Sequence, residues 1–194
     1  MRIDYLERET YRNKTSPHFI HQLQARYGDF YLLPEGGSNQ LALTGCAEIV
    51  TDINIPFDII SIACGTGATL AGMVSALSSD QHAIGFAALK GADFLKRDVA
   101  RMLADSGCTA ADNWHIETGY HFGGYAKASA ELFAFIRQFN SDHSIELDAV
   151  YTGKMFYGLF NLIKQGVFEK GTRIIAVHSG GQQGNAGFPE LVFD

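Results

Sequence analysis

An apolar run that ends directly in a glycine-rich turn limits the folds open to this chain more than any other stretch of its sequence. Residues 57–64 are Phe-Asp-Ile-Ile-Ser-Ile-Ala-Cys, and they lead into the turn Gly65-Thr66-Gly67-Ala68-Thr69. A run with so few polar residues is typical of a strand that is buried on both faces, as in a parallel sheet. A helix is predicted over residues 70–77, so strand, turn and helix form one unit of an α/β fold.

The same order of apolar run, turn and amphipathic stretch recurs along the chain. Further strands are predicted over residues 30–33, 83–89, 115–117 and 173–178, with another ending at residues 149–151. Further helices are predicted after Ser38 or Asn39 and over residues 93–106, 127–139 and 155–165. This alternation predicts a single α/β domain over residues 1–194, in three layers: a mainly parallel, twisted sheet with helices on both faces.

Composition and charge argue against several classes of protein. Fifteen Lys and Arg against 21 Asp and Glu give a net charge of −6, which argues against binding to nucleic acid or to an anionic membrane. No apolar stretch approaches the length of a membrane span, and no signal peptide is evident, so a cytoplasmic protein is expected. Cys46, Cys64 and Cys108 have no CxxC spacing and are expected to be reduced, buried thiols.

The turn at residues 65–69 has the chemistry of an anion site. Glycines allow the backbone to approach an anion closely, and the free N–H groups of a helix N-terminus, with the Thr66 and Thr69 hydroxyls, can hold a phosphate. The turn lacks the Gly-Lys-Ser/Thr of a Walker loop and does not match a dinucleotide-binding fingerprint. A strand–helix turn that binds nothing stays open as an alternative.

Three more turns contain small or polar residues next to predicted strands. They are Glu35-Gly36-Gly37-Ser38-Asn39, Tyr151-Thr152-Gly153-Lys154 and His178-Ser179-Gly180-Gly181. Ligands of open α/β sheets bind at the carboxyl ends of the strands, so these turns are candidates for one site. The alternatives are a plain helix cap at Ser38 or Asn39 and a packing role for Tyr151. The seven histidines have no HxH, HxxxH or HExxH spacing, so no metal site is predicted.

Taken together and in order, these turns resemble one family of pyridoxal-phosphate enzymes, which comprises 1-aminocyclopropane-1-carboxylate deaminase and D-cysteine desulfhydrase. The resemblance extends over residues 31–188 and rests on Leu33 to Asn39, Cys64 to Gly72, Tyr151 to Lys154 and His178 to Gly181. It implies fold type II, with the large-domain portion of a tryptophan-synthase-β-like architecture. It also implies pyridoxal 5'-phosphate as the cofactor, a small amino acid as the substrate and a homodimer.

The resemblance also assigns roles to individual residues. Tyr151 resembles the active-site tyrosine near the substrate, and Tyr125 resembles a second one. The remaining assignments are cofactor binding by Gly65, Thr66, Gly67, Ala68, Thr69, Ser179 and Thr152, and lining of the substrate site by Gly37, Ser38 and Asn39.

Two features of the resemblance bear on the activity. The deaminase has a glutamate after the active-site tyrosine and an apolar residue in the HxGG motif, whereas this chain has Thr152 and Ser179. Neutral hydroxyls make the cofactor ring a weaker electron sink, which favours β-elimination, as in a desulfhydrase, over ring opening. The segment with the family's Schiff-base lysine has no counterpart here, and Lys154 does not match it. The chain is therefore expected to be a truncated and impaired form, without firm covalent attachment of the cofactor. A non-catalytic module for a phosphorylated ligand and an assembly module are the alternatives.

Overall fold

The computed structural model describes residues 3–108 and 112–191. Its internal contacts divide the chain into two compact units, with the division between Leu33 and Pro34. The first unit contains two helices, α1 (Arg8–Arg12) and α2 (Pro17–Tyr27). The Ser16 side chain accepts a hydrogen bond from the backbone N–H of Phe19 and so caps α2. The single domain predicted over residues 1–194 stays a prediction.

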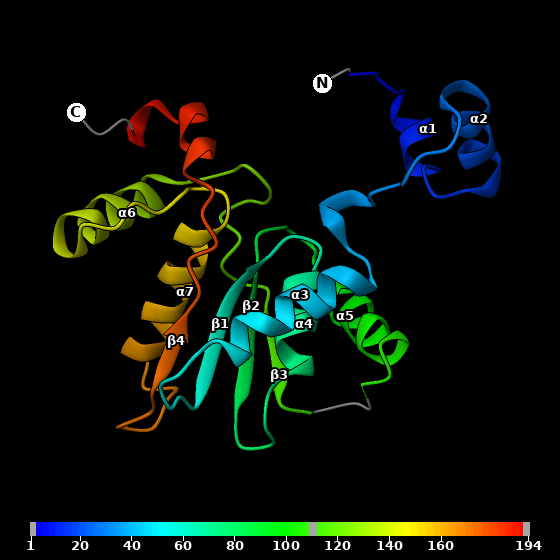
Figure 1. The fold of residues 1–194 in the computed structure, drawn as a ribbon. Coiled ribbons are helices and arrows are strands. Elements are labelled where there is room, and N and C mark those ends of the chain that lie inside the picture. The colour runs from blue at the N-terminus through cyan, green and yellow to red at the C-terminus, as the bar shows by residue number, and fades with distance from the viewer. Residues whose placement is uncertain (1–2, 109–111, 192–194) are drawn as a thin grey trace. The chain divides into compact units, whose positions relative to one another are not determined.

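The second unit is built on a parallel sheet of four strands (Figure 1). These are β1 (Ile59–Cys64), β2 (His82–Ala87), β3 (Trp114–Glu117) and β4 (Ile174–Ala176). Their order is β3-β2-β1-β4, and Ile59 is paired with both His82 and Ile174. The chain moves outward from β1 to β3 and then returns to the other side of β1. The strand order therefore reverses between β1 and β4.

Helices cover both faces of this sheet. On one face α4 (Ala68–Ser75) lies against β1 and β2, with α3 (Gln40–Thr51) and α5 (Phe94–Asp105) packed on α4. On the other face α7 (Thr152–Lys164) lies against the same two strands, and α6 (Ala130–His143) packs on α7. Short 3₁₀ helices are η1 (Glu35–Gly37), η2 (Gln182–Gly187) and η3 (Pro189–Leu191). The expected three-layer α/β fold with a parallel sheet is confirmed.

The burial pattern explains why β1 is apolar along its whole length. Ile60, Ile62 and Cys64 belong to the core under α3, α4 and α5, whereas Ile59 and Ala63 pack into the core under α6 and α7. Because successive side chains of a strand point to opposite faces, both sets must be apolar when both faces are covered. The predicted central strand is therefore confirmed with nearly its predicted bounds.

Two other predicted strands are wrong. Residues 30–33 are irregular, with Tyr31 68% and Leu33 70% exposed, and they have no strand pairing in the described sheet. Residues 149–151 form a turn that leads directly into α7, which begins at Thr152, three residues earlier than predicted. In both places a short apolar run was mistaken for a strand because apolar residues alone do not establish a neighbouring strand.

The three cysteines differ in accessibility, which gives a simple test of the fold. Cys64 is buried, while Cys46 and Cys108 are partly exposed rather than buried as expected. Burial raises the pKa of the Cys64 thiol to about 12, so at neutral pH it is protonated as well as covered. We expect a disulfide reagent such as DTNB to modify two thiols in the native protein and the third only in denaturant. Rapid modification of all three thiols in the native protein would contradict this arrangement.

No helix in the described parts of the chain is long and apolar enough to cross a membrane. Among the same residues, no group of three or more His, Cys, Asp or Glu side chains is placed to hold a metal ion.

Candidate active site

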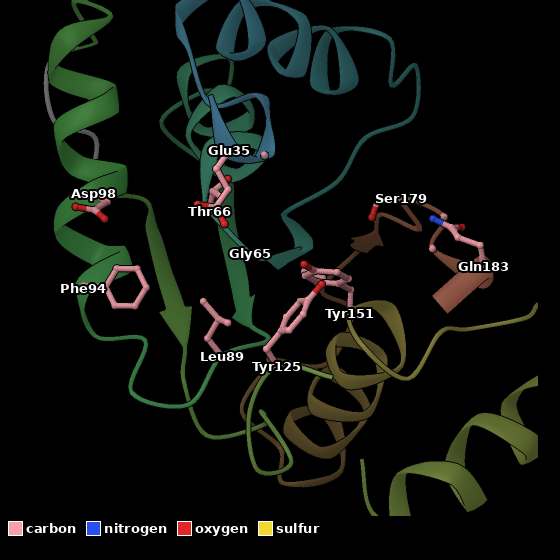
Figure 2. A pocket seen from close by; sticks show the side chains of 14 residues that line it. Glu35, Gly65, Thr66, Leu89, Phe94, Asp98, Tyr125, Tyr151, Ser179 and Gln183 are labelled. Atoms are coloured by element: carbon pink, nitrogen blue, oxygen red, sulfur yellow. The ribbon is translucent and has the colours of Figure 1, made fainter. Parts of the chain in front are cut away.

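A cavity of about 940 Å³ opens at the carboxyl ends of the strands, where the strand order reverses (Figure 2). Open α/β sheets bind their ligands at this kind of reversal, because the loops after the two strands diverge and leave a crevice. The described residues that line it are Glu35, Gly36, Ala63, Gly65, Thr66, Leu89, Phe94, Asp98, Tyr125, Tyr151, Ser179, Gly180, Gly181 and Gln183. All of them lie in the second unit.

The turn between β1 and α4 forms one wall of the cavity. Gly67 has a φ of +84° and caps α4, a conformation that glycine adopts without strain. The first N–H groups of α4 have no acceptor within the helix, and they lie next to Gly65 and Thr66 on the cavity wall. Ser38 Oγ donates to Thr66 Oγ1 at 2.8 Å, which ties the η1 turn to the same wall. This end of the cavity has the donors that an anion requires.

Two tyrosines face the same space from another side. The rings of Tyr125 and Tyr151 meet edge to face, with their centroids 5.9 Å apart. A Cβ atom on Gly65 would lie 3.3 Å from the Tyr151 hydroxyl, so glycine keeps room between the turn and this ring. Burial, the contact with Tyr125 and the nearby charges of Asp148 and Glu35 raise the pKa of Tyr151 to about 12. Its hydroxyl is therefore protonated at neutral pH.

Asp148 holds Tyr151 in place through the first turn of α7. Its buried carboxylate accepts hydrogen bonds from the backbone N–H groups of Val150 at 2.8 Å and Tyr151 at 2.7 Å. Its other oxygen accepts from the N–H of Thr152 at 2.8 Å and from the Thr152 hydroxyl at 2.6 Å. The Thr152 hydroxyl in turn accepts from the Asp148 N–H at 2.9 Å. This reciprocal pairing satisfies donors that a helix start would otherwise leave unpaired.

The Tyr-Thr-Gly-Lys motif therefore has four separate tasks. Tyr151 lines the cavity and Thr152 completes the cap. A Cβ atom on Gly153 would lie 2.6 Å from the Asp148 carbonyl oxygen, so only glycine fits in this turn. Lys154 is fully buried, and its Nζ donates to the carbonyl oxygens of Ala88 at 3.3 Å and Gly124 at 2.8 Å. Burial lowers the pKa of Lys154 to about 8, against an opposing effect from the charge of Asp148.

Five of the predicted site residues line the described cavity wall, and the others lie outside it. Those that line the cavity are Gly65, Thr66, Tyr125, Tyr151 and Ser179. Gly67, Ala68 and Thr69 form the start of α4 directly behind the turn. The described cavity wall contains Glu35 and Gly36 in place of the predicted Gly37, Ser38 and Asn39. Ser38 instead contacts Thr66, and Asn39 caps α3 by accepting from the N–H of Ala42.

Thr152 is also placed away from the cavity wall, because its hydroxyl is paired with Asp148. The assignment of Thr152 to cofactor binding stays a prediction. Sequence reasoning missed Phe94 and Asp98 on α5 and Gln183 on η2, all of which line the cavity. Asp98 is ion-paired with Arg101 at 3.5 Å, and nothing in the sequence distinguishes it from an ordinary exposed helix residue.

An open parallel sheet with a glycine turn, a helix N-terminus and two tyrosines around one cavity is the arrangement of an α/β protein with a candidate anion site at its strand reversal. The family model described as "Pyridoxal-phosphate dependent enzyme" matches residues 6–180. The chain belongs to this family of pyridoxal-phosphate-dependent enzymes, as the sequence resemblance implied. The cofactor of the family is pyridoxal phosphate.

Two curated proteins and one solved structure are similar to this chain. The chain is 32% identical over 164 residues to a Pyrococcus horikoshii protein provisionally assigned as a 1-aminocyclopropane-1-carboxylate deaminase, covering 79% of this chain and 50% of that protein. It is 33% identical to the mitochondrial bifunctional D-cysteine desulfhydrase/1-aminocyclopropane-1-carboxylate deaminase of Arabidopsis thaliana. That match covers 79% of this chain and 42% of the Arabidopsis protein. A crystal structure of an ACC deaminase homologue matches 95% of this chain and 59% of its own, with a TM-score of 0.76 and 28% identity.

The chain therefore spans about half the length of the curated relatives that it matches. The cavity fits the phosphate of the family's cofactor, because its glycine turn and helix N-terminus offer neutral N–H and hydroxyl donors. None of the described residues that line the cavity is a lysine or an arginine. The cytoplasmic location expected from the sequence stays a prediction.

Proposed function

We propose that this chain forms the phosphate-binding and substrate-facing wall of a pyridoxal-phosphate enzyme that deaminates or β-eliminates a small amino acid. The observation on which this rests is the cavity at the strand reversal, where Gly65, Thr66, Tyr151 and Ser179 lie together. Because the chain spans about half the length of its relatives, the activity, the substrate and a homodimeric assembly are all part of the proposal.

Gly65, Thr66 and the first N–H groups of α4 bind the cofactor phosphate in this proposal. When bound, pyridoxal phosphate withdraws electrons from an attached amino acid and makes its Cα–H bond acidic. The chain's own residues then orient the substrate and hold protons. The pKa of Tyr151, raised from its ordinary value to about 12, makes loss of the hydroxyl proton at pH 7 still less favourable. Tyr151 therefore acts as a hydrogen-bond donor, to a carboxylate or a departing thiolate, rather than as a base.

The neutral hydroxyl groups of Thr152 and Ser179 favour β-elimination over opening of a cyclopropane ring. Thr152 is neutral and already paired with Asp148, so it offers no carboxylate to the cofactor ring. Ser179 on the cavity wall is likewise neutral and supports only a weak electron sink. A thiol leaves readily with such a sink, whereas opening a cyclopropane ring requires a stronger one. D-Cysteine is therefore the proposed type of substrate, in line with one of the two activities in the name of the Arabidopsis relative.

Loss of the Thr66 hydroxyl tests the phosphate site. We expect Thr66→Val to weaken binding of pyridoxal 5'-phosphate about tenfold, because a hydrogen bond to a charged group is lost. Binding of pyridoxal, which has no phosphate, should be weaker in the wild-type protein and unchanged by the substitution. Calorimetric titration measures both affinities. Thr44→Val on exposed α3 is the matched control and should leave both affinities at the wild-type value.

Two further experiments distinguish the proposed function from its alternatives. Borohydride reduction of the loaded protein, followed by peptide mapping, shows whether one lysine reacts stoichiometrically or several exposed lysines react weakly. The first result means that the chain supplies its own attachment site, and the second means that it holds the cofactor by its phosphate alone. If a nucleotide or inorganic phosphate raises the melting temperature as much as pyridoxal phosphate does, the chain is a binding module for another phosphorylated ligand.

A further inference from the structure

Lys154 is a buried cation to which the proposed reaction gives no task. The side chain is 1% exposed, and it is absent from the described wall of the cavity. Its Nζ donates to two backbone carbonyl groups that are far apart in the sequence, Ala88 at 3.3 Å and Gly124 at 2.8 Å. Burying an ammonium group is costly unless its hydrogen bonds are satisfied. An apolar side chain would fill the same space at lower cost, so the two hydrogen bonds require an explanation.

One of these partners belongs to a strained loop. Phe122 and Ala126 both have a φ of +51°, which is unfavourable for residues with a side chain. Between them, Gly123 and Gly124 have φ values of +96° and +124°. Four positive φ values within five residues persist only when surrounding contacts hold the backbone in place. The remaining residue of this stretch, between Gly124 and Ala126, is Tyr125.

The hydrogen bonds within the loop are short-range, and the ring of Phe122, which packs edge to face on Tyr157 of α7 with centroids 4.8 Å apart, holds only the start of the loop. Gly124 N–H donates to the His121 carbonyl at 3.0 Å, and Lys127 N–H donates to the Gly124 carbonyl at 3.1 Å. Lys154 adds a hydrogen bond that joins the Gly124 carbonyl to α7, and through Ala88 it joins the same point to the end of β2. Tyr125 itself is 56% exposed, so burial does little to fix its ring.

We propose that Lys154 is a positioning residue, which anchors the strained loop of residues 121–127 to the sheet and so holds Tyr125 against Tyr151 at the cavity. The first turn of α7 then positions both tyrosines. Asp148 holds Tyr151 through its backbone N–H, and Lys154, three residues after Tyr151, holds Tyr125 through the carbonyl of the preceding Gly124. This gives the lysine of the Tyr-Thr-Gly-Lys motif a task without any contact to substrate. The proposal deepens the proposed function and rests on it only in placing the cofactor in the cavity that Tyr125 lines.

Hydrogen exchange of the full chain tests the anchor directly. Lys154→Met keeps an unbranched side chain, one atom shorter, and removes both hydrogen bonds, and Lys164→Met, at the exposed end of α7, is the matched control. We expect amides of residues 121–127 to exchange about tenfold faster in Lys154→Met, with peptides from β1 and α5 unchanged. Unchanged exchange in the loop overturns the proposal, as does acceleration of equal size throughout the chain. If Lys154→Met does not fold, Lys154→Gln replaces it.

A double-mutant cycle distinguishes positioning from a general structural role. Lys154→Met should weaken pyridoxal phosphate binding about tenfold in the wild-type background and have no effect in a Tyr125→Ala background. Equal weakening in both backgrounds would show that Lys154 does not act through Tyr125, and would overturn the proposal. If the wild-type chain does not bind pyridoxal phosphate, the proposed function fails, while the exchange measurement still decides whether Lys154 anchors the loop.

Discussion

Asp148→Asn is expected to lower the free energy of unfolding by about 3 kcal/mol, more than an ordinary polar substitution does. The carboxylate accepts four hydrogen bonds, from three backbone N–H groups and the Thr152 hydroxyl. In asparagine one of the two oxygens becomes an NH₂ group. Whichever way the amide is turned, at least one buried N–H at the start of α7 then loses its acceptor. Buried Lys154 also loses a nearby negative charge.

Urea denaturation measures this loss as a lower midpoint at an unchanged slope. Asp105→Asn is the matched control, because Asp105 is exposed at the end of α5, and it should change the free energy of unfolding by less than about 0.5 kcal/mol. Equal midpoints for the two variants would show that the Asp148 cap contributes nothing to stability. The position of Tyr151 would then need another explanation.

Local signals in the sequence explain why much of the fold could be predicted. The apolar run at residues 57–64 and the glycines after it predict β1 and α4 to within two residues. Burial on both faces requires apolar residues along β1, and the positive φ before α4 favours glycine. The same holds for α5, predicted over 93–106 and observed at Phe94–Asp105. Where the pattern was only a few apolar residues long, at 30–33 and 149–151, it predicted strands that do not exist.

Tertiary partners explain why part of the site could not be predicted. Thr66 and Tyr151 belong to recognisable glycine-containing motifs, and the structure brings both to the cavity. Asp148 precedes its motif and has no distinguishing neighbour, so its four hydrogen bonds become visible only once α7 is built. Lys154 lies 66 residues from Ala88 and 30 from Gly124. No local pattern marks a contact over such separations, and the charge of lysine suggests an exposed residue.

Gly72→Ala and Gly45→Ala are expected to change stability in opposite directions, although both put a methyl group on a helix. A Cβ atom on Gly72 of α4 would lie 2.5 Å from the Leu43 carbonyl oxygen and 2.5 Å from Cys46 Cβ, both in α3. Backbone atoms cannot rotate away, so the two helices must separate, at a cost of about 3 kcal/mol. A Cβ atom on Gly45 meets nothing within 4 Å, and alanine there should stabilise α3 by about 0.5–1 kcal/mol.

The separation of α3 from α4 should also change the cavity, because α3 follows the η1 turn and α4 follows the Gly65-Thr66-Gly67 turn. Ser38 of the first turn and Thr66 of the second are joined by one 2.8 Å hydrogen bond, which cannot persist if the helices move apart. Gly72→Ala should therefore also weaken pyridoxal phosphate binding, while Gly45→Ala leaves it unchanged. Urea midpoints and calorimetric affinities of both variants measure the two effects. A loss of stability in Gly72→Ala with wild-type affinity would mean that the Gly65-Thr66-Gly67 turn holds its shape independently of the α3–α4 contact.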